Sequence, residues 1–322
     1  MIDLERAVGG AKGITELYEF TQTNQVAIIQ FSVDNGIKPQ ILINQQEGSI
    51  YVISGENNVI ISGLTYGKFY KFETIVENNK YVIKLTKENT DRWPILIKAP
   101  SMRGIDNKSL YLIGVYNDGC AKYEEAYKYY YLSATKGFVT AITTVADILL
   151  SDYNNYGVKK DVDAALKLLR TIKPVDRTTE VTQTLTTDYI SQNKKEEAVK
   201  VMKEHLSAKE DLIVRFDLAK LLSPIAGGIG PATEAVESLK ILVKAGNPEA
   251  MQLLAQHLYK GIGTVECRQK ALELDAQACE INPNLKRIYG NNGIYQNIAI
   301  ASATTFAFAG AIYYIWNMRN RH

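Results

Sequence analysis

The sequence predicts a multidomain β + α chain: an N-terminal antiparallel β-sandwich, an all-α array of helix pairs and a single C-terminal transmembrane helix. Three observations support this fold class. Short apolar runs fill the first hundred positions, a helical period begins near Ser109, and residues 298–316 contain no Asp, Glu, Lys or Arg. The expected parts are an extension (1–23), a sandwich (24–98), helical repeats (106–286), a linker (287–297), the membrane segment (298–316) and a short basic tail (317–322).

Alternating apolar residues predict about seven strands in the first part. Residues 24–33 alternate at Ala27, Ile29, Phe31 and Val33, the period of a strand with one buried face. Further runs are PQILI, SIYVI, NVIIS, KFYKFETIVE, KYVIKLT and PILI, separated by turn residues at 34–36, 45–48, 55–58 and 78–79. Because no helical pattern intervenes, this spacing predicts an antiparallel sandwich.

The stretch RWPILI, residues 92–97, carries a resemblance. It is similar to the last strand of CS domains, the p23-like relatives of small heat-shock (Hsp20) domains. The resemblance implies a domain that binds proteins through its sheet faces and edges and has no active site. The absence of His and Cys from residues 24–98 agrees with this, because these are the commonest catalytic side chains. Trp93 is expected in the core in either case.

Five helical segments in the middle of the chain share a small residue at a regular spacing. They align on Ala126, Ala164, Ala198, Ala235 and Ala271, at intervals of 38, 34, 37 and 36 residues. An apolar helical segment precedes each one, and the alanine is expected to let the two helices pack closely. Five helix pairs at this period resemble tetratricopeptide repeats and their Sel1-like cousins. The Sel1-like character lies in the loops at 117–119, 156–158 and 261–263.

Solenoids of this kind bind extended peptides or helices in a concave groove. The candidate groove residues are Tyr123, Tyr127 and Tyr130, within a helix that also carries Tyr129 and Tyr131. The alternative is that this helix is core on one side and partner surface on the other. The Lys and Asn pattern with which some tetratricopeptide co-chaperones hold chaperone tails is not identifiable, so a chaperone partner stays open.

No catalytic, cofactor or metal site is expected, and the chain is predicted not to be an enzyme. The glycine-rich stretch 226–233, AGGIGPAT, has no GK[ST] after it and no strand before it, which favours a repeat loop. His205 and His257 have no second His or Cys at ligand spacing, which favours surface or packing roles. The net charge of +2 gives no sign of nucleic-acid binding, and three cysteines without CxxC spacing predict reduced thiols.

The uncharged segment 298–316 is long enough to cross a membrane. As a helix it reaches about 28 Å, close to the hydrocarbon thickness of about 30 Å. Tyr313, Tyr314 and Trp316 close it, as aromatic residues do at membrane interfaces. The N-terminus has no apolar core of a signal peptide. Because the segment lies so close to the C-terminal end, it is expected to insert after synthesis, as a tail anchor that leaves the bulk of the chain in the cytosol. A buried C-terminal helix is the alternative.

Two features of this anchor predict where it resides and what it touches. In its moderate hydrophobicity and its basic end, Arg319 and Arg321, the segment resembles the tail anchors of the mitochondrial outer membrane and related organelles. Small residues also recur along one face, a pattern that permits close helix approach and predicts docking against a partner within the membrane. They are Ala299, Ala303, Ala307, Gly310 and Ala311.

The order of these parts resembles the receptor subunits of the outer-membrane preprotein translocase (TOM) of hydrogenosomes, which are mitochondrion-derived organelles. The resemblance implies that the cytosolic domains capture preproteins and pass them to a Tom40-type β-barrel. It implies partners among small translocase subunits, and neither cofactor nor nucleic acid. The alternative is a membrane-tethered co-chaperone or quality-control adaptor of the Sel1-like kind at the endoplasmic reticulum.

Overall fold

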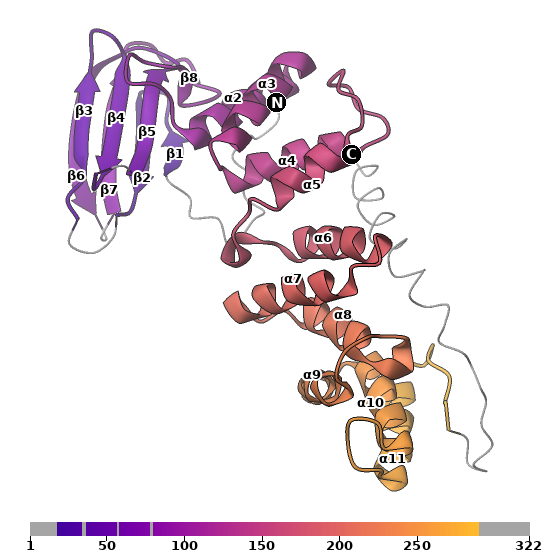
Figure 1. The fold of residues 1–322 in the computed structure, drawn as a ribbon. Coiled ribbons are helices and arrows are strands. Elements are labelled where there is room, and N and C mark those ends of the chain that lie inside the picture. The colour runs from indigo at the N-terminus through magenta and orange to yellow at the C-terminus, as the bar shows by residue number, and fades with distance from the viewer. Residues whose placement is uncertain (1–17, 34–36, 57, 78–79, 290–322) are drawn as a thin grey trace. The chain divides into compact units, whose positions relative to one another are not determined.

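The computed structural model describes residues 18–33, 37–56, 58–77 and 80–289 of the 322-residue chain. The chain divides into two compact units, residues 1–172 and 173–322. The described part of unit 1 holds all eight strands and helices α2 to α5, and that of unit 2 holds helices α6 to α11 (Figure 1).

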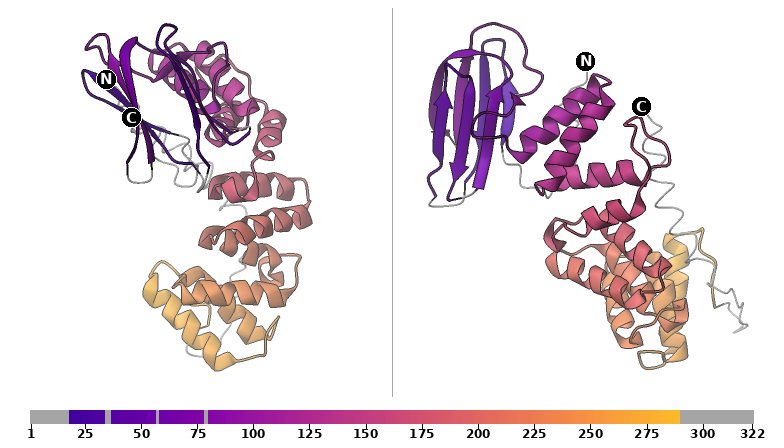
Figure 2. Two further views of the ribbon diagram at one scale, coloured as in Figure 1. Left: turned by 90° about the vertical axis from the view of Figure 1, so that its left-hand side faces the viewer. Right: turned by 45° about the horizontal axis from the view of Figure 1, so that its top comes forward.

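The strands of unit 1 form two four-stranded antiparallel sheets that lie face to face (Figures 1 and 2). Sheet A has the order β1-β2-β7-β6 and sheet B the order β3-β4-β5-β8. The strands are β1 (Glu19–Gln22), β2 (Val26–Phe31), β3 (Gln40–Asn44), β4 (Ser49–Ser54), β5 (Asn58–Thr65), β6 (Phe69–Glu77), β7 (Lys80–Lys87) and β8 (Ile97–Ala99). The predicted antiparallel architecture is therefore confirmed.

One hydrophobic core lies between the two sheets. Along β2 every second residue is buried, including Ile29 and Phe31, because side chains of a strand alternate between its faces. Sheet B contributes Ile50 and Val52 from β4 to the same core, and β7 contributes Leu85. The alternation read from the sequence thus gives the correct inner faces of these strands.

Two strand predictions need correction. β1 lies within residues assigned to an N-terminal extension, so the boundary at residue 24 is too late. The short sequence EFTQ has no apolar alternation, and its pairing with β2 makes it a strand. The sequence predicts the last strand at PILI, residues 94–97, but β8 begins at Ile97. Pro94 cannot donate to a ladder, and the chain bends from Pro94 to Leu96 before pairing with β5.

Trp93 is a core aromatic, as expected. Its side chain is 2% exposed and belongs to the sandwich core. Gln22 at the end of β1 fixes it, since the Gln22 amide accepts from the Trp93 backbone N–H at 2.9 Å and donates to its carbonyl at 2.6 Å. Gly67 leaves room for the indole, because a Cβ there would lie 2.1 Å from Nε1.

The ten described helices pack as five successive pairs. In unit 1 they are α2 (Asn107–Gly119) with α3 (Tyr123–Thr135), and α4 (Val139–Leu150) with α5 (Val162–Leu169). In unit 2 they are α6 (Thr179–Ser191) with α7 (Lys195–Ala208), α8 (Leu212–Leu222) with α9 (Ala232–Lys244), and α10 (Pro248–Lys260) with α11 (Arg268–Ile281). Polar side chains cap the first helix in four of the five pairs: Asp106, Thr178, Asp211 and Asn247.

The repeat alanine behaves as predicted in four of the five pairs. Ala126, Ala198, Ala235 and Ala271 have no exposed surface. In the second pair the prediction is wrong by one residue, since Ala164 is half-buried and Ala165 is fully buried. Asp161 caps α5 through the Ala164 N–H, which starts the helix at Val162 and directs Ala165 toward the core.

Asp106 ties the sandwich to the first helix. Its carboxylate accepts from the Ser62 N–H of β5 at 2.9 Å and from the Ser109 N–H in the first turn of α2 at 2.8 Å. Burial raises the pKa of this carboxyl in spite of these bonds. Tyr18 meets the same turn, with its hydroxyl 2.8 Å from Ser109 Oγ. The sandwich and the first two helix pairs consequently belong to one unit.

Within the described residues, no helix combines the length and the apolar character that a membrane crossing requires. The expected transmembrane segment, its stripe of small residues and the basic tail with Arg319 and Arg321 all lie outside the described residues. The turns expected at 34–36 and 78–79 lie outside them as well.

Candidate functional site

The tyrosines predicted to line a groove lie on α3, the second helix of its pair. Tyr123 and Tyr127 are half-buried and contact other rings: Tyr123 meets Tyr156 edge-on at 5.8 Å between centroids, and Tyr127 lies 6.1 Å from Tyr131. Tyr131 exposes 45% of its surface, the largest exposed aromatic area on this helix. Contact of Tyr123 and Tyr127 with a partner stays a prediction.

The assignment of Tyr130 to the groove is wrong. Its side chain is 3% exposed and packs against the rings of Tyr111 and Tyr156. Its hydroxyl donates to the Asp118 carboxylate at 3.2 Å, and the Tyr156 hydroxyl donates to the same oxygen at 2.8 Å. Burial, with the charge of Asp118 nearby, raises the pKa of Tyr130 far above its ordinary value. Tyr130 therefore joins α2 and α3 and offers no surface to a ligand.

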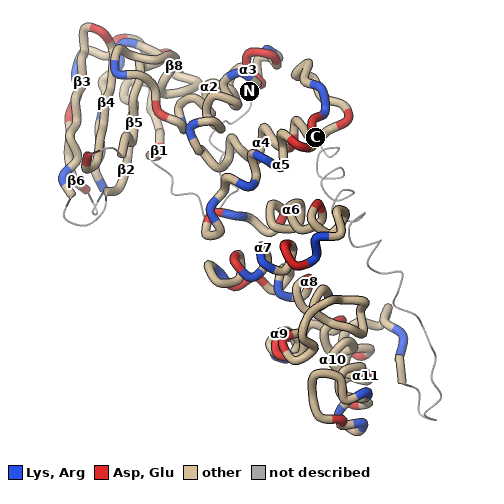
Figure 3. The backbone as a smooth tube through the Cα atoms, viewed as in Figure 1, with Lys and Arg blue, Asp and Glu red and all other residues tan. Residues whose placement is uncertain are grey.

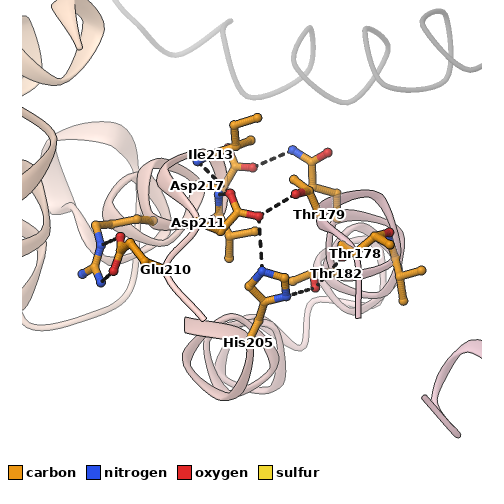
Figure 4. Close-up of polar contacts among 12 residues, drawn as sticks. Thr178, Thr179, Thr182, His205, Glu210, Asp211, Ile213 and Asp217 are labelled. Atoms are coloured by element: carbon orange, nitrogen blue, oxygen red, sulfur yellow. Dashed lines mark hydrogen bonds and ion pairs between the residues drawn. The ribbon is translucent and has the colours of Figure 1, made fainter. Parts of the chain in front are cut away.

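His205 lies in a network that joins three helices of unit 2 (Figure 4). Its Nδ1 is 2.8 Å from Thr182 Oγ1 on α6, and its Nε2 is 3.2 Å from the Asp211 carboxylate before α8. Asp211 also accepts from the N–H groups of Ile213 and Val214, as the N-cap of α8. The order Thr–His–Asp is that of a hydrolase triad, but His205 has no exposed surface and Thr182 only 1%. No substrate reaches this hydroxyl, so the network is structural.

His257 makes a second buried connection, between α10 and the loop after α8. Its Nδ1 is 2.7 Å from the Ile262 carbonyl and must donate there, which leaves Nε2 to accept from the Ser223 hydroxyl at 2.8 Å. Burial lowers the pKa of His257, because desolvation disfavours the imidazolium. Of the two roles expected for these histidines, packing is the one observed. The glycine-rich stretch 226–233 lies in the connection between α8 and α9, as predicted, with residues 227–231 in the loop and the last two in the first turn of α9.

Successive first helices of unit 2 share a partly exposed polar surface, which we call the first-helix face: Gln183, Phe216, Asp217 and Lys220. The Gln183 amide on α6 donates to the Asp217 carboxylate on α8 at 2.9 Å. Lys220 pairs with the same carboxylate at 2.8 Å and lies 4.8 Å from the centroid of the Phe216 ring. An amide, a carboxylate, an ammonium and an aromatic ring thus lie within one patch across two repeats.

Sequence reasoning missed the first-helix face, although a signal for it existed. Gln183 and Asp217 are 34 residues apart, which is one repeat, so they occupy similar places on successive first helices. Polar residues at repeat spacing on a first helix are candidates for partner contact, because the apolar residues of these helices are buried in the core.

The chain leaving the last pair is held to it by a buried carboxylate. Asp275 on α11 has no exposed surface and accepts from the N–H groups of Ile288 and Tyr289, both at 3.0 Å, and from the Gln252 amide at 3.0 Å. The Tyr289 ring stacks on Tyr259 of α10 with centroids 4.2 Å apart. Residues 286–289 are therefore held against the last helix pair.

Charge and cysteine chemistry point to no further site. Lys and Glu are interspersed along α7, as Figure 3 shows, and form no single-sign patch there. Among the described residues, no three His, Cys, Asp or Glu side chains gather in a group that could hold a metal ion. The three cysteines, Cys120, Cys267 and Cys279, form no disulfide.

The described fold is a β-sandwich joined to serial helix pairs, and solved structures with parts of this fold are similar to it. No protein-family model matches the chain, and no curated protein matches its sequence. A Sel1 repeat protein from Oxalobacter formigenes is similar at 18% identity and TM-score 0.45, over 62% of this chain and 86% of that one.

Two further structures are similar in fold. One is c5321, a protective antigen of uropathogenic Escherichia coli with an SLR fold, at 18% identity and TM-score 0.46, over 63% of this chain and 46% of that one. The other is a nuclear movement protein from E. cuniculi, at 19% identity and TM-score 0.21, over 25% of this chain and 96% of that one. At such identities no function is transferred to this chain.

Proposed function

We propose that this protein is a non-catalytic receptor that binds client polypeptides through its helix repeats. The observation that carries the proposal is the first-helix face of unit 2, where a ring, an ammonium, a carboxylate and an amide lie partly exposed across two successive repeats. Helix repeats stack so that equivalent positions form one extended surface, which suits an extended chain or a helix.

The finer proposal is that the receptor belongs to the preprotein translocase of the outer membrane of a mitochondrion-type organelle. Its support comes from the sequence: an uncharged span at 298–316, a basic end, and a sandwich followed by helix repeats. In this proposal the clients are preproteins, and a Tom40-type pore accepts them from the receptor. The alternative is a co-chaperone or quality-control adaptor with the same domains, located at the endoplasmic reticulum.

Site-specific cross-linking tests client binding. A photo-reactive residue replaces Phe216 in the full-length chain in detergent, and a matched one replaces Glu237, whose side chain is exposed on the second helix α9. A presequence-bearing preprotein is expected to cross-link from position 216 and not from position 237. Equal labelling at both positions would remove the first-helix face as the binding surface.

Location separates the two receptors. A tagged full-length chain is expected to fractionate with the mitochondrion-type organelle and to resist carbonate extraction. Recovery with the endoplasmic reticulum favours the quality-control adaptor, and recovery without any membrane contradicts the tail anchor.

A further inference from the structure

Strand β6 is an unusually open edge of the sandwich. It has nine residues and ends sheet A, whereas the other edge strands β1, β3 and β8 have four, five and three. No described strand pairs with its outer edge, and in Figure 1 it lies on the side of the sandwich away from α2. Natural sheets shorten, cover or charge such edges, because an unpaired strand is a template for pairing with another chain.

On one face β6 exposes apolar side chains, whereas its charged residues Lys71, Glu73 and Glu77 lie on the other face. Phe72 and Val76 are 42% and 62% exposed. Their partners in the ladder are Leu85 and Tyr81, so they lie on the face of sheet A that carries the core. A bulge between Phe69 and Lys71 interrupts only the start of the strand, which leaves residues 71–77 in regular register with β7.

The sequence of this regular stretch, KFETIVE, is complementary to itself when it is read antiparallel about Thr74. Lys71 then lies opposite Glu77, and Phe72 opposite Val76. Thr74 lies on the two-fold axis, opposite its own copy. Opposite charges and aromatic–β-branched pairs are the favourable cross-strand pairs of antiparallel sheets. Every second residue of an edge strand points its backbone N–H and C=O outward. When two copies pair about Thr74, the outward-pointing residues of one copy lie opposite those of the other, so their backbone groups can hydrogen-bond.

We propose that β6 binds a second copy of this chain, edge to edge, and joins two sheets A into one eight-stranded sheet. The occupant is the same strand, since one register pairs Lys71 with Glu77, Phe72 with Val76 and the backbone groups of both copies. The remaining pair, Glu73 with Ile75, lies on the outer face. Phe72 of each copy then meets Val76 of the other, which gives two apolar pairs on the core-bearing face, one on each side of the Thr74 pair. Lys71, which pairs with Glu73 of its own strand at 2.7 Å, gains Glu77 of the copy on the outer face. The pairing goes beyond the proposed function, because it needs neither a client nor a membrane.

Charge reversal tests the register directly. Lys71→Glu places two like-charge pairs in the dimer, and Glu77→Lys does the same with the opposite sign. Each variant alone is expected to weaken self-association of the full-length chain in detergent by about tenfold. An equimolar mixture of the two variants is expected to dimerise again, because positions 71 and 77 then carry opposite charges at both ends of the paired strands. Sedimentation velocity over a concentration series measures this, and circular dichroism checks that each variant is folded.

A cysteine on the two-fold axis provides an independent measurement. In a chain whose own cysteines are replaced by serine, Thr74→Cys is expected to give a disulfide-linked dimer on mild oxidation, because the two sulfurs lie opposite each other. Thr21→Cys, exposed on the opposite edge strand β1, is the matched control and is expected to stay monomeric.

Three outcomes overturn the proposal: a wild-type chain that stays monomeric, single variants that associate like the wild type, or a mixture that fails to recover. If the wild type is monomeric while Lys71→Glu reduces client cross-linking, β6 accepts a client strand instead of its own copy. Loss of cross-linking at position 216 would bear on the proposed function and leave the dimer untouched.

Discussion

Two buried imidazoles, His205 and His257, make the stability of unit 2 depend on pH, because burial lowers the pKa of each. His257 is buried and neutral, with one ring nitrogen donating to a carbonyl and the other accepting from Ser223. Its folded pKa is lowered, so its contribution to stability is present above the unfolded value of about 6.5 and is lost as the pH falls through the folded pKa.

We therefore predict that acidification below about pH 6.5 lowers the melting temperature of unit 2. The His257→Gln variant is expected to be less stable than the wild type at neutral pH. Its melting temperature should fall less on acidification, because glutamine takes up no proton. Thermal unfolding followed by circular dichroism across this pH range measures both slopes. Identical slopes in wild type and variant would show that His257 does not titrate as inferred.

Asp275 holds residues 286–289 against the last helix pair. Asp275→Asn turns an acceptor oxygen into a donor that faces backbone N–H groups, which is expected to cost about 1–3 kcal/mol for each buried donor left unpaired. Trypsin is then expected to cleave after Lys286 or Arg287 sooner than in the wild type. Glu273→Gln, an exposed change on the same helix, is the control and should leave the digestion rate unchanged. Equal rates in all three chains would contradict the clamp.

Among the helices, the contact of α2 with α3 depends on the absence of a side chain. A Cβ at Gly114 would lie 2.6 Å from the Tyr130 ring, whereas a Cβ at Gly119 on the same helix would have no atom within 4 Å. Gly114→Ala is expected to lower the free energy of unfolding by about 1–3 kcal/mol through overpacking. Gly119→Ala, which gains only helix propensity, is expected to be neutral or slightly stabilising. Denaturant unfolding compares them, and equal effects would refute the close packing at Gly114.

The predicted anchor helix allows a second prediction at this scale. If its small residues form a docking face, the double variant Ala303→Leu/Ala307→Leu should remain in the membrane, because leucine raises the hydrophobicity of the segment. The same variant should no longer bind the translocase. Native gels and recovery of the pore protein read this out. Recovery of the pore at the wild-type level would show that the stripe is not the docking face.

For the molecule as a whole, the basic residues Arg319 and Arg321 are expected to determine which membrane the protein is targeted to. Replacing Arg319 and Arg321 with Ser is predicted to divert the full-length chain to the endoplasmic reticulum, because a moderate apolar segment then lacks its flanking charge. Fluorescence microscopy with organelle markers measures the distribution. An unchanged location would count against targeting by these arginines. As a control, the purified variant in detergent should bind clients as the wild type does.

Much of the architecture was predictable, because the sequence shows two regular spacings: alternation of apolar residues in the strands and a repeat of about 36 residues in the helices. Alternation along β2 and β4 gave the buried faces of the sandwich, and the spacing of Ala126, Ala198, Ala235 and Ala271 gave the helix pairs. The errors fell where the period is short or absent. β1 has four residues and no alternation, and the alanine of the second pair is displaced by the cap at Asp161.

The kind and approximate place of most elements, and the buried face of the longer strands and helices, follow from the sequence, because these depend on neighbours within a few residues. The tertiary structure alone decided which distant segment covers that face. It placed Tyr130 in the core, brought Gln183 to Asp217 one repeat away, enclosed His205 with Thr182 and Asp211, and left β6 as an open edge. The period of apolar residues in one segment shows which side of that segment is buried. A contact needs two segments, and it depends on the register between segments that are far apart in the chain.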